Sequence, residues 1–265
     1  MAKKRDYTKI GTCIFCKRDT SQTTFKEKAH TVSKSLGGQN IGVDICDECN
    51  HYFGEPDKKL FPRLSIEVCV KEILGLSQIL LQDNPDKILK SKYFNYYRNL
   101  GKITVKPQFR RNRQWLQLFA HQFKRGLYEM WLQEYHKFSN DGLNPVFDEI
   151  RRFARYDIGD IPLYYAINNG CIPVGENIQH PTFNINEQSL QDMYDYGFYS
   201  LLIEGHFFLM EITSKARLSR CVYLPKMAQK LHIGSFIYRD LIEIKSITDI
   251  DFSYRTLFAN NISIL

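Results

Sequence analysis

Three short stretches near the start of the chain decide its fold: CIFC at residues 13–16, KEKAHTVSKSLGGQN at 26–40 and CDECNHYFG at 46–54. They contain two C-x2-C pairs, Cys13 with Cys16 and Cys46 with Cys49. Four thiolates complete the tetrahedral coordination of a zinc ion and leave no position open for water or substrate. The sequence therefore predicts a structural Zn²⁺ site, with these four cysteines as ligands, that closes a loop of 29 residues.

The remaining cysteines, Cys69, Cys171 and Cys221, stand singly along the chain. Isolated cysteines are typical of reduced thiols rather than of a disulfide framework. No run of 18 apolar residues is present, and the basic N-terminus lacks the apolar core of a signal peptide. We therefore expect a cytoplasmic protein that has no membrane partner.

The zinc segment resembles the HNH (ββα-metal) endonucleases, in the subset that carries a four-cysteine structural zinc. In that pattern a histidine opens a run of the type H-x-x-x-x-S-L-G-G, and C-x-x-C-N closes the motif at the start of a helix. HTVSKSLGG at residues 30–38 and CDECN at 46–50 fit these two parts. The resemblance covers about residues 10–60, and it implies hydrolysis of DNA phosphodiester bonds with a catalytic divalent cation, Mg²⁺ or Mn²⁺.

His30 is the residue that this resemblance makes the general base. Phosphodiester hydrolysis needs an activated water, and a neutral imidazole accepts a proton from water near physiological pH. The alternative is that His30 packs on the strand of the module and bonds a backbone carbonyl.

The resemblance also makes Asn50 a ligand of the catalytic cation, presented from the start of the helix. An amide oxygen is a hard ligand that suits magnesium. The alternative is that Asn50 caps the N-terminus of the helix, which asparagine does well. The neighbouring His51 is as compatible with a catalytic role as with a place on the helix surface.

One position departs from the family pattern, because Ala29 stands where an Asp or Glu commonly precedes the histidine. Glu27 and Asp44 are candidates for the missing carboxylate, although both are equally read as surface charges. The departure also supports another function, a zinc module that binds nucleic acid without cutting it.

The net charge of +7 is unevenly distributed, since eight Lys or Arg residues and no acid lie between Arg98 and Arg125. Such a stretch is either a solvated face or a surface that contacts phosphates. Beside a motif of nuclease type we expect the second. The candidate DNA-binding residues are Lys34, Lys102, Lys106, Arg110, Arg111 and Arg113.

Apolar periodicity and turn signals predict an α+β fold, with a zinc-bound ββα-metal module, a helical middle and a mixed or antiparallel C-terminal sheet. The expected domains are residues 1–58, 59–156 and 157–265. Helices are expected over residues 49–54, 60–81, 84–99, 113–138 and 145–156. Strands are expected over 29–32, 43–45, 102–105, 161–166, 198–203, 206–212, 220–224 and 235–244.

The sequence holds no further motif in residues 157–265. That region leaves open a third function, a nuclease effector gated by a ligand or a protein partner. Cutting both strands of a palindromic site would require two active sites and hence a homodimer, whereas a nickase would act as a monomer.

Overall fold

The computed structural model describes residues 6–55, 64–81, 91–97, 102–168, 171–174, 181, 183–234, 238–251 and 256–259. Within these residues the structure contains seven α-helices. They are α1 (Asp47–Gly54), α2 (Ile66–Leu81), α3 (Pro107–Arg110), α4 (Arg113–Ser139), α5 (Asp148–Tyr156), α6 (Glu187–Tyr196) and α7 (Lys215–Gly234). Short 3-10 helices cover Lys34–Leu36 (η1), Pro145–Phe147 (η3) and Ile247–Asp249 (η5).

The main sheet has four antiparallel strands in the order β5-β6-β3-β7. Its strands are β3 (Leu163–Asn168), β5 (Phe198–Ile203), β6 (His206–Glu211) and β7 (Tyr238–Glu243). Two further pairs are the antiparallel β1 (Phe94–Tyr97) with β2 (Lys102–Val105) and the parallel β4 (Cys171–Val174) with β8 (Thr256–Ala259). The expected α+β class and the antiparallel C-terminal sheet are confirmed.

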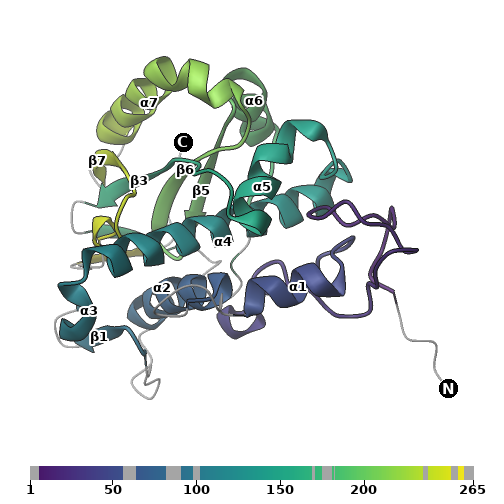
Figure 1. Cartoon of the computed structure of the whole chain (residues 1–265). Helices are drawn as coiled ribbons and strands as arrows, with labels where there is room; N and C mark the ends of the chain where they lie inside the picture. Colours follow the sequence, from purple (N-terminus) through teal and green to yellow (C-terminus); the bar gives the residue numbers. More distant parts are fainter. Residues whose placement is uncertain are drawn as a thin grey trace.

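Helices cover both faces of the main sheet, with α6 and α7 on one face and α4 on the other (Figure 1). The sequence explains this burial, since adjacent residues of one strand serve opposite cores. Tyr164 of β3 belongs to the cluster under α7, whereas Tyr165 belongs to the larger core that contains α4. Strand β6 is consequently buried at every position.

Helix α4 runs through the middle of the molecule, between the sheet and helices α1 and α2 (Figure 1). Most of its residues are buried, polar ones among them, because the helix has neighbours on several sides. Asn112 caps its start by accepting the Trp115 amide at 3.0 Å. Gly126 allows α2 to approach closely, because a Cβ there would lie 2.3 Å from Val70 Cγ2. The helix predicted over residues 113–138 is confirmed.

One apolar core extends from Cys13 in the zinc segment to Ile250 after β7. It includes the buried aromatic side chains of α4 and one face of the sheet. The zinc segment therefore packs on the same core as the rest of the described chain. The expected three-part division into domains stays a prediction.

Two of the predicted elements were wrong. Residues 94–97, expected as the end of a helix, form β1 paired with β2, while residues 84–90 and 98–99 of that expectation lie outside the described residues. Residues 220–224, expected as a strand, lie inside α7. Their apolar composition favoured a strand, but Ala216, Tyr223 and Met227 follow helical spacing and pack on the sheet.

The two strands expected at 29–32 and 43–45 reduce to one antiparallel bridge between His30 and Ile41. Asp44 interrupts the second stretch, because its backbone is left-handed with φ of 57°. Gly37 also has positive φ, 86°, a conformation that glycine adopts without strain. Helix α6, by contrast, was not predicted from the sequence.

None of the helices in the described ranges is both long enough and apolar enough to cross a membrane.

A buried histidine joins the sheet to α2. His206 of β6 is fully buried, and its Nε2 lies 2.8 Å from Ser77 Oγ while its Nδ1 lies 3.2 Å from the Tyr165 hydroxyl. Burial lowers the pKa of His206 to about 3. The imidazole is therefore neutral in the folded protein near neutral pH.

We predict that His206 makes the free energy of unfolding fall as pH drops below about 6.5, the value of an unfolded histidine. The unfolded chain then binds a proton that the folded chain excludes, so stability decreases by about 1.4 kcal/mol per pH unit. Urea unfolding at about pH 7 and about pH 5 should show a loss about 2 kcal/mol larger for the wild type than for His206→Gln. Equal losses in the two proteins would contradict this assignment.

Candidate active site and zinc centre

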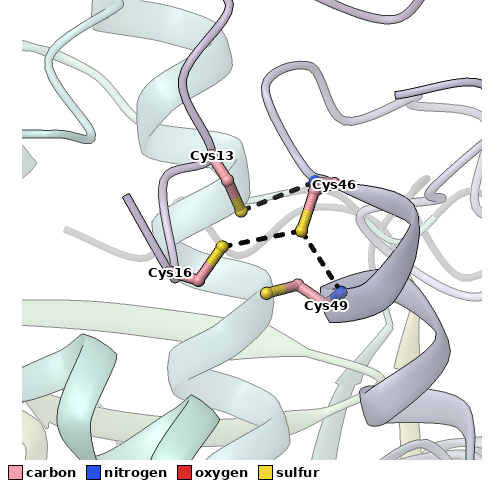
Figure 2. A group of neighbouring side chains, drawn as sticks. All are labelled: Cys13, Cys16, Cys46 and Cys49. Atoms are coloured by element: carbon pink, nitrogen blue, oxygen red, sulfur yellow. Dashed lines mark hydrogen bonds between the residues drawn. The ribbon is translucent and has the colours of Figure 1, made fainter. Parts of the chain in front are cut away.

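The four predicted zinc ligands come together at one point. Their sulfur atoms all lie within 4.8 Å of one another, and Figure 2 shows them pointing toward a common centre. The Cys16 and Cys46 sulfurs are 3.6 Å apart. A tetrahedral ion with sulfur at 2.3 Å requires about 3.8 Å between sulfurs, so the cluster has the dimensions of a zinc site. In the part of the chain that the structure describes, no other group of three or more metal-ligating side chains is gathered in this way.

Tight backbone turns bring these sulfurs together. In the first pair, the amide of Cys13 donates to Arg18 O at 2.8 Å, and Lys17 adopts φ of 60°. In the second pair, Cys46 caps α1, and its sulfur accepts the Cys49 amide at 3.4 Å. Amide donation to sulfur favours the thiolate form that binds a metal.

Two guanidinium groups touch the cluster from outside. Arg18 Nε donates to Cys16 Sγ at 3.4 Å, and Arg155 Nε of α5 donates to Cys49 Sγ at 3.3 Å. Four thiolates around Zn²⁺ carry a net charge of about −2, so the two arginines balance that charge.

The thiols cannot all ionise together without a cation. The hydrogen bond with Cys13 lowers the pKa of Cys46 to about 6, whereas contact with the other thiols raises the pKa of both Cys13 and Cys49. The donor set, its spacing and its charge balance therefore all fit zinc.

Next to the zinc centre, a cleft of about 550 Å³ separates the module from helices α2 and α4. Its polar lining combines the motif residues with cations and acids from several elements. The polar side chains are His30, Thr31, Ser33, Ser35, Asn50 and His51, the cations Lys28, Lys34 and Lys71, and the acids Glu55, Glu67 and Glu129. The structure thus brings together His30, Asn50, His51 and Lys34, as the sequence predicted.

Helix α4 fixes the segment that presents His30. The His30–Ile41 bridge is flanked by bonds from the Gly42 amide to Ala29 O at 2.8 Å and from the Thr31 amide to Asn40 O at 3.1 Å. Glu134 of α4 accepts both the Thr31 hydroxyl and the Asn40 amide group, the latter at 3.0 Å. His30 is half-buried and lines the cleft.

Asn50 lies in the second turn of α1, beside Glu27. Its amide nitrogen donates to Glu27 Oε2 at 3.1 Å, which places the two predicted ligands side by side. Because Cys46 is the N-cap of α1, the alternative interpretation of Asn50 as the helix cap is wrong. His51 is exposed and forms an ion pair with Glu55 at 3.0 Å.

Asp44 does not reach this cleft. It is fully buried, and its carboxylate accepts the Gly11 amide at 2.8 Å and contacts His136 Nε2 at 3.0 Å. Burial by itself raises the pKa of Asp44, but the hydrogen bonds from His136 and the backbone amides outweigh it and lower the pKa. Asp44 therefore fastens the N-terminal segment to α4.

The sequence did not identify Glu129, which lines the cleft from α4. Its side chain is 9% exposed, and the Gln133 amide one turn later donates to it. Burial raises the pKa of Glu129, and the nearby Glu67 carboxylate adds to this effect. No local signal marks Glu129, because Arg125 and Gln133, one turn away on either side, are also polar and the sequence does not say where the helix packs.

The predicted basic surface is only partly next to the cleft. Arg110, Arg111 and Arg113 are exposed around α3 and the start of α4, and no ion pair involves them in the described residues. Lys106 is half-buried and donates to Ser91 O at 2.7 Å. Lys102 belongs to β2, but its side chain lies outside what the structure describes.

Comparison with known proteins agrees with this geometry. Residues 13–61, about a fifth of the chain, match the model of a family described as HNH endonuclease. No curated protein and no solved structure matches the chain. The resemblance inferred from the motif is confirmed for this segment, which matches the HNH endonuclease model and carries the four-cysteine cluster.

We predict that Cys46→Ser removes zinc and unfolds the module, since metal binding supplies folding free energy in small zinc domains. Metal analysis should give about one zinc per chain for the wild type and clearly less for the variant. Cys221→Ser is the matched control, because Cys221 is an exposed thiol on α7. Full zinc occupancy in Cys46→Ser would show that the ligand set is wrong.

Proposed function

We propose that this protein is a metal-dependent endonuclease of the HNH type that hydrolyses phosphodiester bonds in DNA. The observation that carries the proposal is the cleft in which His30 and Asn50 share the wall of the family-matched segment with Lys28 and Lys34. Cations beside the candidate base favour a polyanionic substrate over a neutral one.

His30 serves as the general base in this proposal. Its backbone is held by the bridge to Ile41, and the bonds of Thr31 and Asn40 to Glu134 hold that bridge against α4. A base held in one orientation takes the proton from an attacking water without first being ordered. The basic side chains of Lys28 and Lys34 orient the phosphate in front of it.

This chemistry implies a divalent cation, Mg²⁺ or Mn²⁺. Once bound, such a cation would neutralise the charge that develops on the phosphate. Asn50 and Glu27 lie together at the base of α1 and offer oxygen atoms, which are the ligands that these ions prefer. His51 stands next in the helix and keeps its imidazole at the cleft.

The exposed arginines near the start of α4 supply a second contact surface for DNA. From Arg113 to Gly126, which lines the cleft, the helix axis advances about 20 Å at 1.5 Å per residue. With about 3.4 Å between phosphates along one strand, that distance spans about six nucleotides. One short duplex is therefore long enough to reach from the cleft to the arginines.

We predict that His30→Ala lowers the rate of DNA cleavage by about 10²–10⁴-fold, because the base acts only in the chemical step. Nicking of supercoiled plasmid with Mg²⁺ or Mn²⁺ measures the rate, and zinc content and DNA binding should stay close to those of the wild type. His121→Ala is the control, since His121 lies on α4 paired with Asp157 and does not line the cleft. Near-normal cleavage by His30→Ala would rule out this base.

The triple variant Arg110→Ala, Arg111→Ala, Arg113→Ala should bind all DNA sequences more weakly. Each phosphate contact contributes about −0.9 to the slope of log K against log salt concentration, so the slope should flatten by up to about three units. The cleavage rate at saturating DNA should change little. Binding titrations at several salt concentrations provide the measurement.

A matched control removes three exposed cations elsewhere, Arg152 on α5 with Lys226 and Lys230 on α7. If the slope of the arginine variant equals that of the wild type, these arginines form a solvated face. The path of DNA would then have to be sought at the N-terminal segment instead.

A further inference from the structure

Three acids line the cleft, and among the described residues only Glu129 has no lysine, arginine or histidine paired with it. Glu55 pairs with His51 at 3.0 Å, and Glu67 pairs with Lys71 at 2.6 Å. Among the described residues, Glu129 has no ion pair and receives only the amide of Gln133. It is also the most buried of the three acids.

A carboxylate in this setting is costly unless a positive charge comes to it. Glu129 is 9% exposed, so water solvates it poorly. A carboxyl group removed from water takes up a proton unless a cation or several hydrogen bonds offset the lost hydration of its ionised form. A single amide donor does not provide that compensation, whereas a metal ion in the cleft would.

The family-matched segment does not supply the metal-binding acid that the family commonly has before the histidine. Ala29, at the position where the family commonly has an acid, is 3% exposed and belongs to the apolar core. A carboxylate substituted there would be buried in that core. The buried acid that lines the cleft is instead Glu129 of α4, about a hundred residues beyond His30 in the sequence.

We propose that Glu129 is a ligand of the divalent cation in this cleft and replaces the acid that is absent at Ala29. This inference rests on the proposed nuclease function, and it extends the site beyond the family-matched residues 13–61. Magnesium is usually held by one or two carboxylates and keeps several waters. A magnesium site therefore does not need three protein ligands that lie close together before the ion binds, whereas the zinc centre has four.

The test is a titration of the full-length, zinc-loaded protein with Mn²⁺. Electron paramagnetic resonance measures the concentration of free Mn²⁺ at each step. Glu129→Gln keeps the shape of the side chain and removes its charge. We expect its affinity for Mn²⁺ to be at least about tenfold lower than that of the wild type. Glu187→Gln removes the same charge from the exposed start of α6 and should bind Mn²⁺ as the wild type does. Equal affinities of Glu129→Gln and the wild type would overturn the proposal.

A second measurement uses only the wild-type protein and so does not depend on the folding of a variant. Fe²⁺ with ascorbate and peroxide cuts a polypeptide close to the bound ion. We expect cuts near Glu129 in α4 and near Asn50 in α1, and we expect excess Mg²⁺ to suppress them. Cuts confined to other segments would contradict the assignment.

The inference and the proposed function can fail separately. If the wild type cuts DNA through His30 while Glu129→Gln binds Mn²⁺ normally, the ligand assignment is wrong and the nuclease stands. If Glu129→Gln loses Mn²⁺ affinity while the wild type cuts no DNA, the ligand assignment stands and the proposed reaction is wrong.

Discussion

The position of the zinc module depends on a seam of buried polar contacts along α4. Asp44 and His136 are both fully buried, and they meet at 3.0 Å. Two residues before His136 in the same helix, Glu134 accepts hydrogen bonds from Thr31 and Asn40. Removing one member of such a buried contact leaves the other polar group without its partner, which costs about 1–3 kcal/mol. The module is thus held in one orientation, and the cleft exists only because of that orientation.

Two further constraints act on the same module. The four cysteines bring its two ends together at the predicted zinc site, and Arg155 connects this cluster to α5. The loop between them is supported from the far side, where Gln78 of α2 donates to Leu36 O at 2.6 Å and to Glu204 at 2.9 Å. Glu204 lies at the turn of the β5–β6 hairpin, so the C-terminal sheet is joined to the loop that follows His30. The regions outside the family-matched segment therefore take part in building the cleft.

The sequence was informative where function depends on residues close together in the chain. The spacing of Cys13, Cys16, Cys46 and Cys49 is sufficient to predict a metal site, because each pair lies within a single turn. The contacts of Glu129 and Asp44 could not be predicted in this way, since they join residues about ninety positions or more apart. Local pattern also failed at residues 220–224, where packing against the sheet overrode an apolar run that favoured a strand. Helix α4 was predictable because its apolar pattern continues over seven turns.

The central claim is that the zinc module, α2 and α4 together form one metal-dependent site that cuts DNA. A crystal structure of the full-length His30→Ala variant with Mn²⁺ and a short duplex tests it most directly, through anomalous scattering at the manganese and zinc edges. We expect zinc among the four cysteines and manganese in the cleft, in contact with Glu129 and with a phosphate of the duplex. A duplex bound on another surface, with no manganese in the cleft, would contradict the assignment of the cleft as the active site.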